Sequence, residues 1–255
     1  MNRWQRGRKR LILLIFVLAL LVLVLLPLYY FFYRAPTCSD GKINGDETGL
    51  DCGGSCQRLC APDSLPLISR GDTRVLKIAT STYEAVAIVE NPNAGEVRNA
   101  EYTIQVYSGG VSPTKIIKGE IYVPPNSRFA IFEGPFILDS TPTRAILEWH
   151  EDTLSWQKSK ANSPIEVKSS SFTRILPTRL QVRIVNTSLN SISNIDLIAL
   201  ISDKEGNLFA ASKTLVDKIS SKGEAVALFS WQQPFPTEPA SIEILIKLLP
   251  SRILR

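Results

Sequence analysis

The longest apolar run of the chain, Leu11 to Phe32, holds 22 residues without a charge. At about 1.5 Å per residue, a helix of this length reaches about 33 Å and crosses the hydrocarbon core of a bilayer. The run also lacks the polar face that a helix at the edge of a soluble core presents to water. The pattern therefore predicts a membrane-spanning segment over residues 11–33.

The two flanks of this run differ in charge. Five basic residues and no acidic residue precede it, namely Arg3, Arg6, Arg8, Lys9 and Arg10. Because basic flanks remain in the cytoplasm, we expect a cytoplasmic tip at residues 1–10, with residues 34–255 outside the cell membrane. A cleaved signal peptide is the alternative, but its apolar region spans about 7–15 residues and ends at small residues. Tyr33-Arg34-Ala35-Pro36 offers no such cleavage site, which favours an uncleaved signal anchor.

Beyond Cys60 the chain changes to short alternating runs rich in Val, Ile, Tyr and Phe, separated by turn signals such as Asn91-Pro92-Asn93. Strands of this length at a spacing of about 8–12 residues are typical of an antiparallel β-sandwich. The strands predicted for a first sandwich are Arg74–Ala79, Tyr83–Glu90, Glu101–Tyr107, Lys115–Val123, Ser127–Phe132 and Arg144–Trp149.

A polar break at residues 158–164 precedes a second set of alternating runs. The two sets align at an offset of 95 residues, which places Ile88-Val89-Glu90-Asn91 opposite Arg183-Ile184-Val185-Asn186. Such a period indicates an internal duplication of one domain. The strands predicted for a second sandwich are Ser171–Ile175, Arg179–Val185, Asn194–Ser202, Leu208–Thr214, Glu224–Trp231 and Ser241–Leu248.

These patterns predict a mainly β protein in which two tandem antiparallel sandwiches follow one transmembrane helix and a small disulfide-rich loop module. The expected domains are a basic tip at 1–10, the anchor at 11–33, a cysteine-rich stalk module at 34–62, sandwiches at 63–160 and 161–250, and a tail at 251–255.

Charge narrows the choice of partner. The chain is formally +5, but the five basic residues of positions 1–10 leave 24 of the 29 Lys and Arg to balance the 24 Asp and Glu. Nucleic-acid binding needs positive charge concentrated on the binding domain. The neutral remainder therefore excludes nucleic acid as the expected partner.

All four cysteines, Cys38, Cys52, Cys56 and Cys60, lie within 23 residues of one another. An even number of cysteines outside the cytoplasm favours two disulfides, for which three connectivities exist. A zinc site is the competing interpretation. It fits less well, because structural zinc sites usually use paired C-x2-C knuckles and no histidine lies nearby.

The loop between the first two cysteines is rich in oxygen ligands. If Asp40 is position 1 of a twelve-residue calcium loop, the ligand positions are occupied by Asp40, Asn44, Asp46, Thr48 and Asp51. This spacing suits a cation with six to eight oxygen ligands. Lys42 at position 3 and the short closing carboxylate of Asp51 depart from the EF-hand pattern. Asp, Asn and Gly are also the residues of tight turns, so a purely structural loop is an equal alternative.

The stretch Cys38 to Cys56 reads CSDGKINGDETGLDCGGSC and matches every fixed position of a motif of secreted and surface proteins, C-x-D-G-x-x-N-G-x-E-x-G-x-D-C-G-G-x-C. This resemblance implies a small, acidic, disulfide-closed module on the cell exterior. The β-rich halves resemble immunoglobulin-like sandwiches of the FxLYD and late-embryogenesis-abundant type-2 kind, with the signature changed to Ala199-Leu200-Ile201-Ser202-Asp203. That resemblance implies a binding or spacer module without catalytic residues of its own.

Catalytic motifs are missing from the sequence. His150 is the only histidine, and no nucleophile elbow, P-loop, H-E-x-x-H or dinucleotide fingerprint occurs. We therefore expect a non-enzymatic protein, without a cofactor other than calcium, that binds, adheres or acts as a spacer at the cell envelope. Its expected partner is a protein or a cell-surface polysaccharide. The alternative is an accessory subunit of a secretion or pilus-type assembly that uses the membrane helix as a contact surface.

Overall fold

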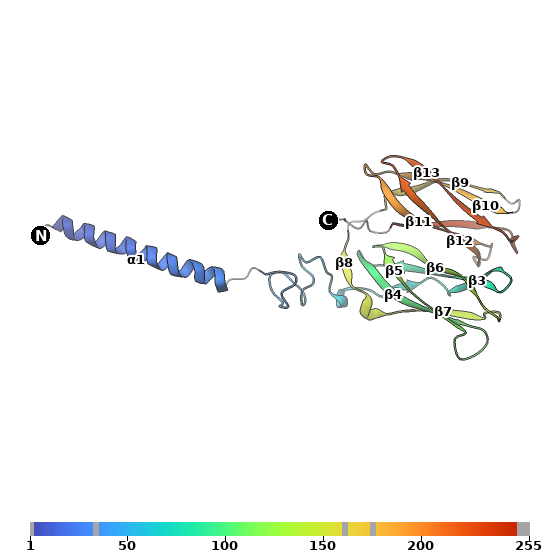
Figure 1. Ribbon diagram of the computed structural model, residues 1–255, viewed down its shortest axis with the longest axis horizontal. Coiled ribbons are helices and arrows are strands. Elements are labelled where there is room, and N and C mark those ends of the chain that lie inside the picture. Colours follow the sequence, from blue (N-terminus) through green and yellow to red (C-terminus); the bar gives the residue numbers. More distant parts are fainter. Residues whose placement is uncertain (1–2, 33–35, 160–162, 174–176, 249–255) are drawn as a thin grey trace. The chain divides into compact units, whose positions relative to one another are not determined.

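The computed structural model describes residues 3–32, 36–159, 163–173 and 177–248. The chain divides into two compact units, residues 1–56 and 57–255. The first unit holds a long helix and an irregular loop, and the second is built of β-strands (Figure 1). The expected tail 251–255, Tyr33 at the end of the predicted anchor, and Arg174-Ile175 at the end of a predicted strand lie outside the described residues.

The helix α1 (Arg3–Phe32) contains the whole of the predicted apolar run. Its stretch Arg8–Tyr30 is long and apolar enough to cross a membrane, and none of that stretch is buried within the protein. Because water solvates so much apolar surface poorly, the helix fits a membrane anchor or a signal sequence.

The first half of the second unit consists of two antiparallel sheets, here named the first sheet pair. In one sheet β3 pairs with β1, β2 and β6, and in the other β4 pairs with β5, β7 and β8. The strands are β1 (Ile68–Ser69), β2 (Arg74–Ala79), β3 (Thr82–Asn91), β4 (Gly95–Tyr107), β5 (Lys115–Val123), β6 (Ser127–Ile137), β7 (Arg144–Trp149) and β8 (Trp156–Lys158). Two short 3-10 turns, Ala61–Asp63 and Glu151–Thr153, accompany them.

The second half repeats this topology as the second sheet pair. Strand β10 pairs with β9 and β13, as β3 pairs with β2 and β6, and β11 pairs with β12 and β14, as β4 pairs with β5 and β7. The strands are β9 (Ile165–Thr173), β10 (Thr178–Asn186), β11 (Ile192–Ser202), β12 (Leu208–Ile219), β13 (Glu224–Trp231) and β14 (Ser241–Leu248).

A buried asparagine closes the same corner of each repeat. The Asn91 amide donates to the carbonyls of Gly95 and Pro124, and its oxygen accepts from the Asn93 N–H. The Asn186 amide donates to the carbonyls of Asn190 and Ser220, and its oxygen accepts from the Ser188 N–H. Both side chains are almost fully buried. The predicted offset of 95 residues thus corresponds to equivalent backbone positions.

Alternation along the strands places an apolar core inside each sheet pair. In β10, Leu180, Val182 and Ile184 are fully buried, whereas Arg179, Gln181 and Arg183 point outward and are exposed. The other strands show the same alternation, because successive side chains lie on opposite faces of a sheet. Two buried clusters result, one within each sheet pair.

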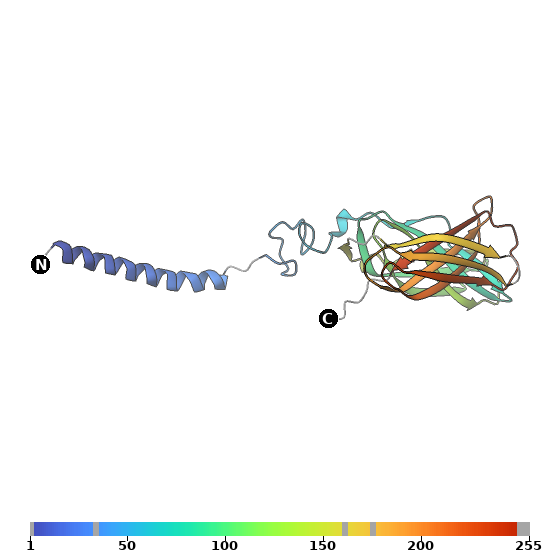
Figure 2. The same ribbon diagram turned by 90° about the horizontal axis from the view of Figure 1, so that it is seen from above.

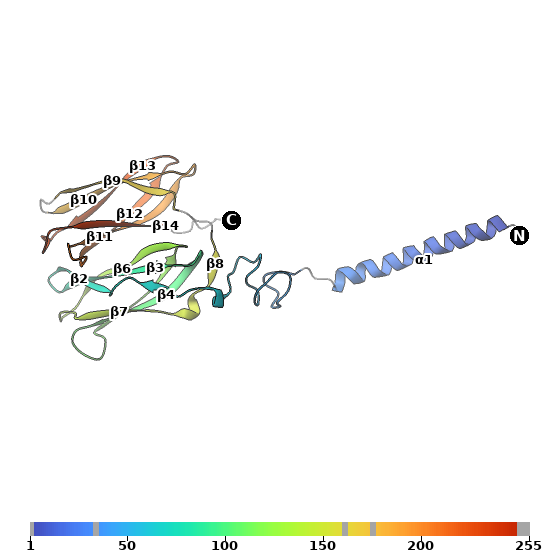
Figure 3. The same ribbon diagram turned by 180° about the vertical axis from the view of Figure 1, so that it is seen from behind.

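A third apolar cluster joins the two sheet pairs. Leu76, Val86 and Ala130 on the outer face of the β2-β3-β6 sheet pack with Ile198, Leu200, Ala211 and Leu245 on the outer face of the β12-β11-β14 sheet. Arg128 and Glu243 form an ion pair of 3.2 Å across the same contact, which we name the joint. Four layers therefore lie one above another (Figure 3), and the sheet pairs overlap when seen from above (Figure 2).

Most predicted strands are confirmed, with differences at their ends. Strand β9 begins at Ile165, six residues before the predicted start, because its exposed Ser169–Ser171 run carries no apolar alternation. The short strands β1 and β8 were not predicted, since two or three residues are too few to show a period. Strand β12 continues to Ile219, beyond the predicted Thr214.

Candidate functional site

The predicted cysteine cluster is oxidised. Cys38 and Cys56 form a disulfide, which joins the first and third cysteines of the motif. Cys52 and Cys60 are also disulfide-bonded, and no cysteine is free. Because zinc is held by thiolates, the disulfides remove the ligands that the competing zinc interpretation requires.

Two of the predicted calcium ligands accept hydrogen bonds from one end of the loop. Asp40 accepts from the backbone N–H of Lys42 at 3.0 Å and from the Asn44 amide at 3.0 Å. The Asn44 bond is the main reason why the pKa of Asp40 lies below its usual range. Both oxygens of Asp51 face the N–H of Gly41, at 3.0 and 3.2 Å.

Two further predicted ligands, Asp46 and Thr48, lie in a second group of contacts. Asp46 accepts from the Ser55 hydroxyl at 2.7 Å, and the Thr48 N–H donates to the carbonyl of Cys52 at 3.1 Å. Gly54, at φ +48°, permits this fold because a Cβ there would collide with the Asp46 carbonyl. The loop is therefore held by its own carboxylates, as the turn interpretation requires.

The fit of this loop to a calcium ion is partial. The Asn44 side-chain oxygen is buried without a hydrogen-bond partner, so it is available as a ligand. Among the described residues, the ligand atoms of Asp40, Asp46 and Asp51 do not gather within 4.8 Å of one another, and the group that does is Cys38, Glu47 and Cys56. Both of those cysteines are in a disulfide. Calcium binding by the five predicted residues stays a prediction.

A second cluster, mostly of polar and charged side chains, lies on the outer face of the β5-β4-β7 sheet. We name this the β4 face, and its outward residues are Glu101, Thr103, Gln105, Ile116, Lys118, Glu120, Arg144, Ile146 and Glu148. The Gln105 amide donates to Glu148 at 2.8 Å, and the Tyr107 hydroxyl donates to Gln105 at 2.6 Å. Arg144 lies over the Tyr107 ring, 4.3 Å from its centre.

His150 connects two groups of this face. Its Nε2 is 2.9 Å from the Thr103 hydroxyl, and its Nδ1 is 3.4 Å from a Glu101 carboxylate oxygen. An acid, a histidine and a hydroxyl in this order resemble the start of a nucleophilic triad. The N–H groups of Glu101 and His150 are already bonded to Thr153 Oγ1 and to the Glu101 carbonyl, so neither can stabilise an oxyanion. The contacts instead fix the surface of the sheet.

The joint carries buried charges beside its apolar cluster. Glu84 lies on the joint face of β3, and burial raises its pKa to about 7. Within the described residues no hydrogen bond or ion pair compensates this carboxyl. On the opposite face Asp196 forms ion pairs with Lys213 at 3.3 Å and with Lys247 at 3.6 Å. Desolvation lowers the pKa of Lys247 despite the Asp196 carboxylate.

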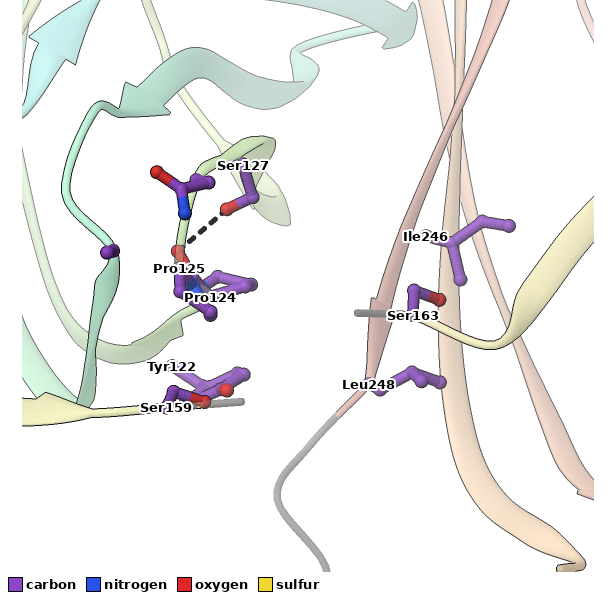
Figure 4. A pocket seen from close by; sticks show the side chains of 10 residues that line it. Tyr122, Pro124, Pro125, Ser127, Ser159, Ser163, Ile246 and Leu248 are labelled. Atoms are coloured by element: carbon purple, nitrogen blue, oxygen red, sulfur yellow. Dashed lines mark hydrogen bonds between the residues drawn. The ribbon is translucent and has the colours of Figure 1, made fainter. Parts of the chain in front are cut away.

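A cavity of about 410 Å³ opens beside the joint (Figure 4). Ile246 and Leu248 of β14 line one side, and the Pro124-Pro125 turn after β5 lines the other. The Ser127 hydroxyl donates to the Pro124 carbonyl at 2.8 Å, and the Tyr122 hydroxyl donates to Glu96 at 2.8 Å. These polar groups are therefore already bonded to the protein.

No protein-family model matches the chain, and no curated protein matches it in sequence. Functional conclusions therefore rest on its own residues.

In the sequence His150 stands out only as the single histidine, and no motif connects it with Glu101 or Thr103. The available signal was the alternation of Glu101, Thr103 and Gln105 along one predicted strand. That alternation places the three side chains on one face. It does not tell which strand lies next to them, and the contact with His150 depends on the pairing of β4 with β7.

Proposed function

We propose that the chain is a non-enzymatic, membrane-anchored protein whose β-rich part binds partners outside the cytoplasm. In this proposal α1 is an uncleaved anchor with a cytoplasmic N-terminus, and the sheet pairs are the immunoglobulin-like sandwiches expected from the sequence. Residues 34–62 are the disulfide-closed stalk expected from the sequence. The partner is a protein or a polysaccharide of the cell envelope.

The joint is the observation that carries this proposal. A plain spacer needs only separate domains on a polar linker, whereas here seven buried residues unite the sheet pairs into one compact unit. Each aliphatic side chain removed from water contributes about 1.5–3 kcal/mol. A fixed joint holds the outer faces in a constant arrangement, which favours presentation of a binding surface over simple extension.

The proposed orientation draws on two features. The basic residues precede the apolar run, within the first part of α1, and cysteines persist as disulfides in oxidising compartments. Tags at the two ends of the full chain test it in intact cells treated with protease. The C-terminal tag should be degraded and the N-terminal tag preserved. Protection of the C-terminal tag in intact cells, with degradation after permeabilisation, would contradict the proposed topology.

Binding is tested with the full chain in liposomes. These liposomes should adhere to cells or to immobilised envelope polysaccharide more strongly than empty liposomes do. Adhesion no greater than that of empty liposomes contradicts the proposed binding role.

A photoreactive residue at Leu18 tests the subunit alternative. Because Leu18 is exposed on α1, its crosslinking to one dominant membrane protein would favour an accessory subunit of a larger assembly.

A further inference from the structure

The joint uses one outer sheet face from each repeat. In each repeat the outer face of the other sheet is left uncovered. It packs the outer face of β3 and its neighbours, from the first repeat, against the outer face of β11 and its neighbours, from the second. By the repeat topology, β10 is the equivalent of β3, and β4 is the equivalent of β11. We name the outer face of β9, β10 and β13 the β10 face. The β10 face and the β4 face are thus the unpaired counterparts of the two faces that form the joint.

These two free faces differ from their buried equivalents mainly in polarity. At the offset of 95 residues, Val86 and Ile88 of the joint correspond to Gln181 and Arg183 of the β10 face. Ile198 and Leu200 of the joint correspond to Thr103 and Gln105 of the β4 face. Polar replacement makes each free face soluble, so any contact that they form is weaker than the joint.

The free faces are complementary in charge. Glu101, Glu120 and Glu148 outnumber the cations Lys118 and Arg144 on the β4 face. The β10 face carries Lys168, Arg179 and Arg183 against Glu166 and Glu224. One ion pair of the joint has the same direction, with Arg128 on the β3 side and Glu243 on the β11 side.

Each free face also exposes aliphatic side chains. Val226 and Leu228 are 52% and 58% exposed on the β10 face, beside the row Arg179, Gln181 and Arg183. Ile116 is 52% exposed on the β4 face, next to Gln105. An interface needs such an apolar centre within a charged rim.

We propose that the β10 face of one copy docks on the β4 face of a second copy, so that copies associate head to tail through a weaker version of the joint. The contact is heterologous, because it uses two different surfaces, and each added copy again leaves one free face of each kind. The proposal does not depend on membrane anchoring.

A pair of introduced cysteines tests this arrangement directly. Val86 and Leu200 belong to one cluster in the joint, and their equivalents on the free faces are Gln181 and Gln105. Within one copy these positions lie on opposite sides of four layers, about 30 Å apart at about 10 Å per sheet spacing, too far for a disulfide. All native cysteines are already bonded. A disulfide between positions 105 and 181 can therefore form only between copies.

The full chain carrying Gln105→Cys and Gln181→Cys is oxidised mildly in liposomes, and the products are identified by mass spectrometry. A matched control carries Val111→Cys with Gln181→Cys, since Val111 is 94% exposed in the loop that joins β4 to β5 and is not one of the residues of the β4 face. We expect crosslinks between 105 and 181 at a yield about ten-fold above the control, decreasing as salt rises from about 0.1 M to 1 M.

Charge reversal supplies a second readout. The Arg179→Glu, Arg183→Glu variant and the Glu120→Lys, Glu148→Lys variant should each lower the yield about 25-fold, at roughly five-fold per reversed charge. An equal mixture of the two should recover it, because each free face then meets an opposite charge. A yield equal to the control overturns the proposal, and so does exclusive 105–105 crosslinking, which indicates a symmetric dimer. Failure of the mixture to recover the yield, with both variants folded, also overturns it.

Discussion

The substitution Asn186→Ala should destabilise the second sheet pair through lost hydrogen bonds. The buried Asn186 amide donates to the carbonyls of Asn190, Ser220 and Ile219, at 2.7, 3.0 and 3.4 Å. Its oxygen accepts from the N–H and the hydroxyl of Ser188, at 2.9 and 2.8 Å. Alanine removes all of these contacts and leaves the backbone groups without a partner at a closed corner.

The magnitude follows from the number of groups that water cannot reach. A net hydrogen bond contributes about 0.5–1.5 kcal/mol, and leaving a buried group unpaired costs about 1–3 kcal/mol. If water replaces the contacts nearest the surface and about three remain unsatisfied, the expected loss is about 3 kcal/mol. For a domain of this size that loss lowers the melting temperature by roughly 6–12 °C.

The assay is thermal unfolding of the full chain in detergent, followed by tryptophan fluorescence and by hydrogen exchange of β10 and β12. Asn91→Ala tests the equivalent corner of the first repeat and should give a similar loss there. Leu189→Ala is the matched control, because this residue lies in the same turn and is 81% exposed. If Asn186→Ala shifts the melting temperature no more than Leu189→Ala, the corner does not hold the repeat and the reasoning fails.

Three further predictions concern the joint and the cysteine loop. Glu84→Gln should raise the free energy of unfolding at pH 8 by up to about 3 kcal/mol. The pKa of Glu84 is about 7 in the folded chain and 4.5 for an ordinary Glu, so wild-type stability falls as pH rises through this window. Denaturant titrations at pH 5 and 8 measure this, and an equal effect at both pH values contradicts it. Leu200→Ala, a truncation of a side chain that is 2% exposed in the joint, should cost about 2–5 kcal/mol. Leu228→Ala on the β10 face should cost under about 0.5 kcal/mol. If Leu200→Ala and Leu228→Ala lower the free energy of unfolding equally, the joint does not stabilise the fold. Calcium at about 0.1–1 mM should protect residues 38–56 from hydrogen exchange if Asp40, Asn44, Asp46, Thr48 and Asp51 bind it, and Asp51→Asn should abolish the protection. No change on adding calcium with the disulfides intact removes the calcium prediction.

The strands of the sheet pairs could be predicted where alternation is regular. Strand β10 buries every second residue and exposes the ones between, so its position and its two faces follow from the sequence. Strand β9 is the counterexample. Its central serines are exposed, and pairing with β10 rather than burial keeps them extended. A strand held mainly by its neighbour's hydrogen bonds leaves little trace in the hydrophobic pattern.

The joint also left a signal in the sequence. In β11 the run from Leu197 to Ile201 is continuously apolar and buried, and in β3 the run from Ala85 to Val89 is nearly so. A strand covered on both faces loses its alternation. These runs predict strands that are buried on both faces, but they do not tell which face of the other repeat covers them. That choice depends on the long-range packing of whole sheets.

The candidate sites were harder to predict because their contacts join distant segments. The ligand-type residues of the cysteine loop follow from spacing, yet their orientation depends on which cysteines pair, and three pairings were open. The group of Glu101, Thr103 and His150 depends on strand pairing across about 50 residues. In both places residue types were identifiable from the sequence, and their mutual geometry was not.

The divergence of the two repeats explains why the chain presents two different surfaces. Equivalent positions carry Ile198 and Leu200 in the joint, and Thr103 and Gln105 on the β4 face, where Thr103 is itself buried. If the free faces served only for solubility, scattered charged residues would suffice. Instead Gln105 is held between Tyr107 and Glu148, and Thr103 is bonded to His150. Fixing polar side chains in place lowers the entropy lost when a partner binds. The ordered β4 face is therefore better suited to recognition than to passive solvation.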